Sequence, residues 1–148
     1  MRVFLASAVT AAICFAQPFG TWRMNPARST FLGGTQPKSL TVRIEPHPKG
    51  EVFTLDRVEP DGRTTSSSSI LYLDGTPRRI DDFTCSGIQT SRRTESGSVE
   101  ILRLCASGGW IQFVRRPTAK PNVLVLEITE QRAENSLRLE RRLILEKQ

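Results

Sequence analysis

The side chains that most often catalyse reactions are scarce in this sequence. Its 148 residues include a single histidine, His47, which stands between two prolines in a turn-like segment. A histidine acts as a general base only where a substrate or nucleophile lies within hydrogen-bond reach, and the sequence contains no nucleophile elbow or phosphate loop. We therefore expect an exposed turn histidine and a protein that is not an enzyme. A hydrolase built on His47 and a neighbouring acid is the enzymatic alternative.

The acidic residues give little support for a metal site. Asp81 and Asp82 are adjacent, and neighbouring side chains in a strand point to opposite faces, so the two carboxylates are poorly placed to share a cation. Glu59 and Asp61 flank a turn signal and are expected to be turn residues. No zinc-ligand spacing is present. We expect neither a bound metal nor a cofactor.

The amino terminus has the pattern of a secretory signal peptide. Met1-Arg2 is a short basic start, Val3–Phe15 is a largely apolar run, and Cys14-Phe15-Ala16 places small residues at the first and third positions before a cut. The pattern predicts cleavage after Ala16, with export to the periplasm or the exterior. The short leader and the preference for arginine over lysine suggest a bacterial source. No apolar run reaches the roughly 18 residues of a membrane span, so we expect no transmembrane span after cleavage.

Removal of the leader leaves two cysteines, Cys85 and Cys105. An even pair in an exported protein is typical of a disulfide. Two strand-like stretches, residues 87–93 and 98–104, flank a turn centred near Glu95. This geometry places the two cysteines opposite each other to within one residue, at a Cα distance that a disulfide can span. Two buried free thiols are the alternative, and redox catalysis is disfavoured because no CxxC spacing occurs.

Beyond residue 20, apolar residues recur with a period of two, which is typical of strands with one buried face. Leu40, Val42 and Ile44, for example, alternate with polar residues. Further strand-like stretches cover residues 51–58, 63–73, 76–83, 110–116 and 123–129. Residues 136–147 contain good helix formers, but their leucines all share odd positions, so we expect a strand there too. Residues 17–148 are predicted to form a single all-β domain, an antiparallel up-and-down β-barrel or barrel-like sandwich of about eight to ten strands.

Two features near the middle of the chain predict turns and edges. Asp74-Gly75 is the strongest hairpin signal in the sequence. Pro77 indicates that the stretch after it is an edge strand or a loop. The serine run Ser66–Ser69 is typical of an edge strand kept soluble by small hydroxyl groups.

The start of the predicted domain resembles a known group of proteins. Gly20–Ser29, which reads GTWRMNPARS, is similar to the G-T-W-x-L-N-x-x-x-S start of small secreted bacterial β proteins of lipocalin-like character, which are largely uncharacterised. The turns Asp61-Gly62 and Asp74-Gly75 and the rhythm of residues 19–148 also resemble that group.

The resemblance implies a role for the first of these motifs. Lipocalins carry a G-x-W near the start of the first strand, which Gly20 and Trp22 match. The tryptophan closes one barrel end beneath an arginine from a late strand, and Arg138, Arg141 or Arg142 could supply that arginine here. A tryptophan in this position plugs an apolar end while its N–H finds an acceptor.

Two functional hypotheses remain. The first is an exported non-enzymatic binding protein that holds a small apolar or amphipathic ligand in the barrel. Its candidate lining residues are Phe53, Leu71, Ile101, Trp110 and Phe113.

The second hypothesis follows from the net charge of +6 and four arginine pairs. These pairs are Arg78-Arg79, Arg92-Arg93, Arg115-Arg116 and Arg141-Arg142. A surface module could use them to bind anionic lipid or polysaccharide. Nucleic acid is disfavoured by the predicted export and by the shortage of aromatics for base stacking. The pairs at 92–93 and 115–116 stand where strands are expected to finish, which favours solvated side chains.

Overall fold

The computed structural model describes residues 17–148, and the predicted signal peptide, residues 1–16, lies outside the described residues. The strands, in chain order, are β1 (Gly20–Met24), β2 (Thr30–Leu32), β3 (Ser39–His47), β4 (Gly50–Val58), β5 (Thr64–Leu71), β6 (Arg78–Asp81), β7 (Ser86–Arg93), β8 (Val99–Cys105), β9 (Trp110–Pro117), β10 (Val123–Gln131) and β11 (Leu139–Lys147). A short 3-10 helix, η1 (Pro26–Arg28), separates β1 from β2. Among residues 17–148, no helix has the length and apolar character needed to cross a membrane.

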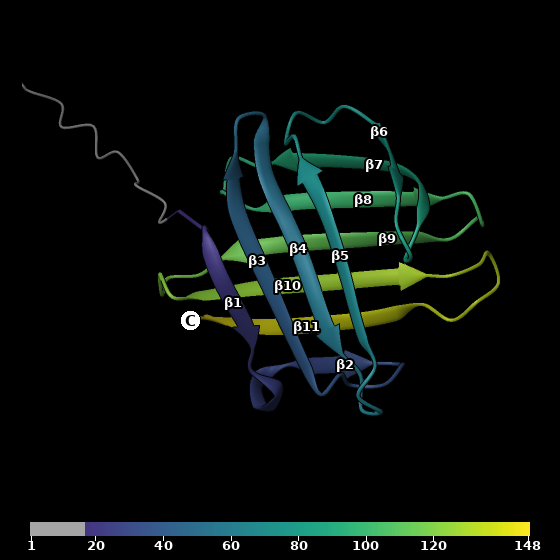
Figure 1. Ribbon diagram of the computed structural model, residues 1–148, viewed down its shortest axis with the longest axis horizontal. Coiled ribbons are helices and arrows are strands. Elements are labelled where there is room, and N and C mark those ends of the chain that lie inside the picture. Colours follow the sequence, from purple (N-terminus) through teal and green to yellow (C-terminus); the bar gives the residue numbers. More distant parts are fainter. Residues whose placement is uncertain (1–16) are drawn as a thin grey trace, which may run out of the picture.

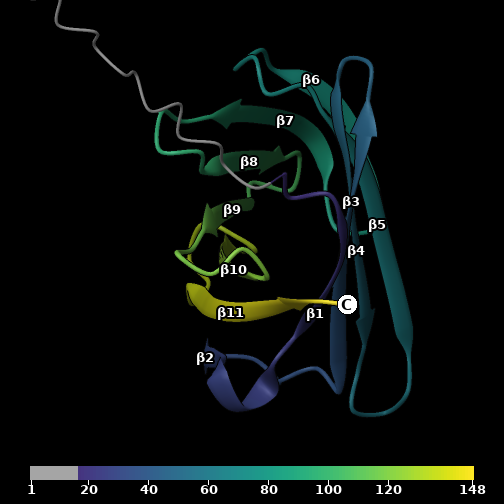
Figure 2. The same cartoon turned by 90° about the vertical axis from the view of Figure 1, so that its left-hand side faces the viewer.

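All strands belong to one antiparallel sheet that curves into a nearly closed barrel. The strand order is β5-β4-β3-β1-β11-β10-β9-β8-β7-β6, with β2 beside β11. Strands β3, β4 and β5 form one layer and cross the layer made by β7 to β11, as Figures 1 and 2 show. β1 joins the layers, because it pairs with β3 on one edge and with the end of β11 on the other. The predicted all-β barrel is confirmed.

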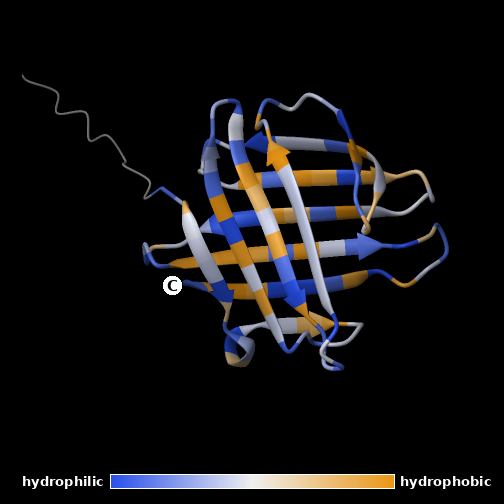
Figure 3. Ribbon diagram, in the orientation of Figure 1, coloured by the Kyte–Doolittle hydropathy of each residue, from blue (hydrophilic) through white to orange (hydrophobic). Residues whose placement is uncertain are grey.

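The last segment forms a strand, β11, as its period-two apolar pattern predicts, although its residues favour a helix. β11 pairs with β10 over eight residues, and Leu143 and Leu145 are fully buried. Alternating hydropathy is visible along the strands in Figure 3. Tertiary burial of one face therefore outweighs the helix preference of the individual residues.

The Asp74-Gly75 segment forms a turn but does not join a hairpin, so that prediction is wrong. β5 and β6, which flank it, are the two opposite edges of the sheet. Gly75 takes a φ of 74°, and its N–H donates to the carbonyl of Ser91 at 2.8 Å. The turn carries the chain from β5 to β6 across the open seam of the barrel, which is the gap between these two unpaired edge strands. β6 pairs with β7 instead. The prediction of an edge strand after Pro77 is confirmed, and so is the edge position of the serine run in β5.

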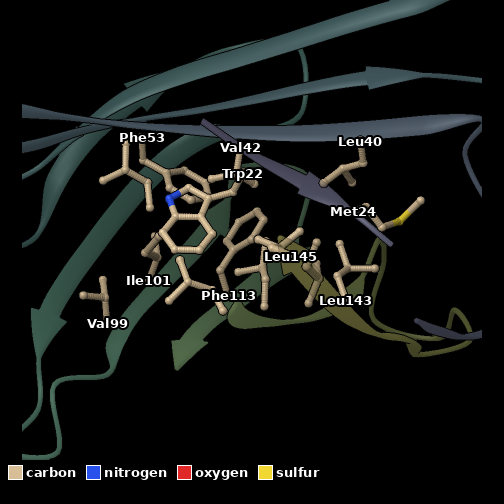
Figure 4. Close-up of a cluster of buried hydrophobic side chains, with 14 of the residues drawn as sticks. Trp22, Met24, Leu40, Val42, Phe53, Val99, Ile101, Phe113, Leu143 and Leu145 are labelled. Carbon is tan, nitrogen blue, oxygen red and sulfur yellow. The ribbon is translucent and has the colours of Figure 1, made fainter. Parts of the chain in front are cut away.

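The core lies between the two layers (Figure 4). Val42 and Phe53 approach it from one layer, and Ile101, Phe113 and Leu145 approach it from the other. The rings of Phe53 and Phe113 meet edge to face with centroids 6.1 Å apart, an arrangement that stabilises aromatic pairs beyond the area they bury.

Trp22, the predicted barrel-end residue, is buried in the core of the barrel. Its side chain is 1% exposed, and its Nε1–H donates to the carbonyl of Pro18 at 2.7 Å. The cation over its ring is Nζ of Lys147, 5.5 Å from the centroid, and none of the three arginines named above takes this place. Arg138 lies over Trp110 instead. Gly20 has a φ of 127°, and a Cβ there would come within 3.0 Å of the Lys147 side chain, so glycine leaves room for this cation.

The disulfide between Cys85 and Cys105 is confirmed, with a Cα–Cα distance of 5.2 Å. The register differs from the predicted one, because Cys105 stands opposite Gly87 rather than Cys85. Cys85 precedes β7, where a turn stabilised by the Asp82 carboxylate returns the chain towards Cys105.

Replacing both Cys85 and Cys105 with serine is expected to lower the free energy of unfolding by about 3 kcal/mol, because the closed loop spans 20 residues. Urea unfolding monitored by tryptophan fluorescence measures the loss. The reduced wild-type protein should unfold at the same urea concentration as the double variant. Equal midpoints for the oxidised wild type and the variant would show that the bond does not stabilise the fold.

Candidate ligand cavity

A cavity of about 450 Å³ opens at the end of the barrel away from Trp22. Cavities that hold small molecules in proteins usually measure about 300–1,000 Å³. The inward faces of β3, β4, β5 and β8 to β11 supply most of its wall. Residues of the connecting segments, namely Pro37, Glu59, Phe83 and Ser107, also line it. The barrel thus has one end closed by packing and one end that is hollow.

The cavity floor is apolar. The apolar side chains that line it are Phe31, Leu40, Phe53, Leu55, Trp110, Ile111, Phe113 and Ile128, and the exposed Phe83 also lines the cavity. Three of the five candidate lining residues, Phe53, Trp110 and Phe113, are among them. Leu71 and Ile101 do not line the cavity, because both are fully buried in the core.

Arginines replace apolar residues at three inward positions around this cavity. Arg103 on β8 is 3% exposed and Arg141 on β11 is 7% exposed, and Arg57 on β4 is partly buried. The sequence carries a signal for two of them, because Arg103 and Arg141 stand two residues from inward-facing Ile101 and Leu143. Period-two spacing therefore assigns these arginines to the interior, and reading Arg141 only as a member of a charged pair misses this.

Arg103 is held by a network that bridges the seam of the barrel. Its Nε donates to Gln89 at 2.9 Å, and its Nη1 donates to Asp82 at 3.1 Å. Nη1 also donates to Oγ1 of Thr84 at 3.1 Å. Serines of the edge strand β5 accept two further bonds, Ser67 at 3.5 Å and Ser69 at 3.3 Å. One side chain of β8 thus ties β5 to β7 and to the loop after β6, where the sheet lacks backbone pairing.

The surroundings of this network lower the pKa of both charged groups, Arg103 and Asp82. Burial lowers the pKa of Arg103, while Asp82 opposes the change, and an arginine remains protonated at any physiological pH. Burial alone would raise the pKa of Asp82. Hydrogen bonds from Thr84 and Ser67 and the charge of Arg103 outweigh it, and the pKa of Asp82 lies below its usual value.

Arg141 has one carboxylate partner and one unpartnered group. Its Nη2 donates to Oε1 of Glu130 at 2.9 Å. Its Nε is buried and has no hydrogen-bond partner. Arg57 is placed similarly at the mouth, where its Nη2 donates to Glu59 at 3.3 Å and to the carbonyl of Thr35 at 3.3 Å.

A separate buried ion pair lies on β4 and β9, two strand positions from the aromatic pair Phe53 and Phe113. Nη1 of Arg115 is 2.6 Å from Oε1 of Glu51, and these side chains are 3% and 1% exposed. Arg93 approaches the other oxygen at 3.5 Å. The prediction of a solvated Arg115 is wrong, because Glu51 provides a counter-charge inside the barrel.

The remaining candidate residues have local structural partners. Nδ1 of His47 accepts the N–H of Lys49 at 3.1 Å in the turn between β3 and β4. Asp81 bonds Ser86 and Asp82 bonds Arg103, so the two adjacent carboxylates have different partners, as strand geometry predicts. Glu59 and Asp61 pair with neighbouring arginines. Within residues 17–148, no three His, Cys, Asp or Glu side chains gather where they could hold a metal ion.

Comparison with known proteins adds no assignment to this geometry: no protein-family model and no curated protein matches the chain. The lipocalin-like resemblance therefore rests on the sequence of Gly20–Ser29 and the two Asp-Gly turns, and the barrel fold is compatible with it.

Proposed function

We propose that the protein is an exported, non-enzymatic binding protein that holds a small apolar or amphipathic ligand in the open end of its barrel. The cavity of about 450 Å³ carries this proposal, because its apolar floor is combined with a few inward polar groups. This combination is typical of sites that bury a ligand and fix its orientation.

The disulfide supports the export part of the proposal. Cys85 and Cys105 are joined, and disulfides form and persist in oxidising compartments such as the periplasm or the exterior. The pattern of residues 1–16 is typical of a signal peptide. Together they support a secreted or periplasmic binding protein.

The alternative, a surface module that binds anionic lipid or polysaccharide, has less support. Seven of the eight arginines in the four pairs lie within 4.0 Å of a carboxylate. Arg79 is the exception among the described residues. An arginine already paired with an acid adds little to a positive surface potential, so the pairs do not form the basic stripe that this alternative needs.

Binding of a neutral apolar probe tests the proposed function. We expect N-phenyl-1-naphthylamine to gain fluorescence on binding the protein, with a saturable titration. Replacing Thr65, a half-buried residue of the cavity wall, with tryptophan fills part of the space and should weaken binding about ten-fold or more. The matched control is Ile88→Trp on the outer face of β7, which should bind as the wild type does.

Two results would contradict the proposal. One is the absence of saturable binding to the wild type. The other is equal affinity in the Thr65→Trp variant, measured on protein whose circular dichroism and melting temperature match those of the wild type.

A further inference from the structure

The charged residues that line the cavity give it an excess of positive charge. They are Arg57, Arg103, Arg132 and Arg141 against Glu59 and Glu130, and Asp82 pairs with Arg103 at 3.1 Å, which leaves one positive charge. An adjoining hollow shares Arg57, Glu59, Arg132 and Arg141 and adds Arg63, which pairs with Asp61. A purely apolar ligand would use none of these charges, and burying them is costly. The charge therefore favours a ligand with an anionic group.

Arg141 is the arginine best placed to receive that group. It lines both the cavity and the adjoining hollow. Its side chain is 93% buried, because only 7% of its surface is exposed, and its Nε lacks a partner. A buried donor without a partner costs free energy that an acceptor on a ligand restores. Arg103 is less available, since each of its three nitrogens already donates to a protein side chain.

We propose that the ligand is an amphipathic monocarboxylate whose carboxylate binds Arg141 and whose apolar chain lies on the cavity floor. This inference rests on the proposed function and adds the charge and orientation of the ligand. Ile128 stands directly opposite Arg141 in the β10–β11 ladder and lines the cavity. The guanidinium thus adjoins the apolar floor, as an amphipathic ligand requires.

The negative charge of Glu130 favours a ligand that carries a single negative charge. This carboxylate already takes one N–H of Arg141 at 2.9 Å and is 14% exposed. A dianionic phosphate would bring a second full charge close to it, and like charges placed close together in a buried site are costly. A monocarboxylate accepts the free N–H with less repulsion.

Displacement of bound N-phenyl-1-naphthylamine at pH 7.5 by three ligands of equal chain length tests the inference. We expect decanoate to bind about ten-fold more tightly than 1-decanol, because a hydrogen bond to a charged group is worth about one factor of ten or more. Decyl phosphate should bind more weakly than decanoate.

Substitutions test whether Arg141 is the arginine that binds the carboxylate. Arg141→Met should bring decanoate and decanol to within about two-fold of each other, while decanol affinity stays near that of the wild type and shows that the cavity is intact. Arg142→Met is the matched control, because this neighbour is exposed and approaches Glu127 on the outer face. It should keep the full preference. Glu130→Gln should tighten decanoate binding, since it removes the competing charge.

The outcomes separate the two proposals. Equal binding of decanol and decanoate to the wild type overturns the carboxylate inference and leaves the binding function standing. Tighter binding of decyl phosphate overturns the choice of a monocarboxylate. Failure of the neutral probe and of all three ligands to bind overturns the proposed function itself, and the inference with it.

Discussion

Replacing Glu51 with leucine is expected to lower the free energy of unfolding by about 3–5 kcal/mol, the usual cost of breaking a buried ion pair. The substitution leaves Arg115, which is 3% exposed, without a counter-charge inside the barrel. Arg93 loses the same partner but is 44% exposed, so water can solvate it. Most of the loss therefore comes from the stranded charge of Arg115. Urea unfolding at pH 7 measures it.

The double variant Glu51→Leu, Arg115→Met separates this cause from damage to packing. Apolar replacement of both partners often restores stability, so the double variant should be at least about 2 kcal/mol more stable than Glu51→Leu alone. The surface pair Arg116 and Glu127, with side chains 51% and 37% exposed, is the control. Glu127→Leu should cost no more than about 1 kcal/mol. A double variant as unstable as the single one would rule out the ion-pair explanation.

Most of the strand layout follows from the sequence, because one physical signal dominates it. A sheet with one buried face needs alternation of apolar and polar residues, and this alternation is present in β3 and β11. In β11 it correctly overrides the helix preference of Leu, Arg and Glu. The edge position of β5 also follows, since its serine run has too little apolar surface to occupy the centre of a sheet.

The errors arise where a local signal depends on distant partners. Asp74-Gly75 has the chemistry of a tight turn, but only the three-dimensional closure of the barrel determines that β6 pairs with β7 and not with β5. Arg115 stands near the end of a strand and reads as solvated, yet Glu51, 64 residues earlier in the chain, neutralises it. Pairing partners far apart in sequence leave no local trace.

The arginine pairs have a different role in the fold from the one that their sequence suggests. Read along the chain, the arginine pairs suggest a positive surface. In the fold, one member of two of these pairs, Arg115 and Arg141, faces inward and is buried, while its neighbour pairs with Glu127 on the outer face. The alternation of a strand therefore divides these two doublets between interior electrostatics and solubility.

The second large effect is expected at the seam of the barrel. Replacing Arg103 with methionine should cost about 3 kcal/mol at pH 7, because it leaves Asp82 and Gln89 without their buried cation. Arg43→Met is the control, since that arginine is 47% exposed and pairs with Asp56 on the surface, and it should cost less than about 1 kcal/mol. Urea unfolding of both variants beside the wild type gives the two values.

Acid should narrow the difference in free energy of unfolding between the wild type and Arg103→Met. The pKa of Asp82 lies below its usual value in the folded protein, partly because of Arg103, so its charged form contributes stability above the pKa of the unfolded chain, about 4. That contribution is lost as the pH falls through the folded pKa. In the variant, the charge of Arg103 no longer offsets the effect of burial on Asp82. The charged form of Asp82 therefore contributes less to the stability of the variant, and acid removes less. The gap should thus be largest at pH 7 and shrink below about pH 4, whereas a gap that stays constant down to pH 3 would show that Arg103 acts through packing alone.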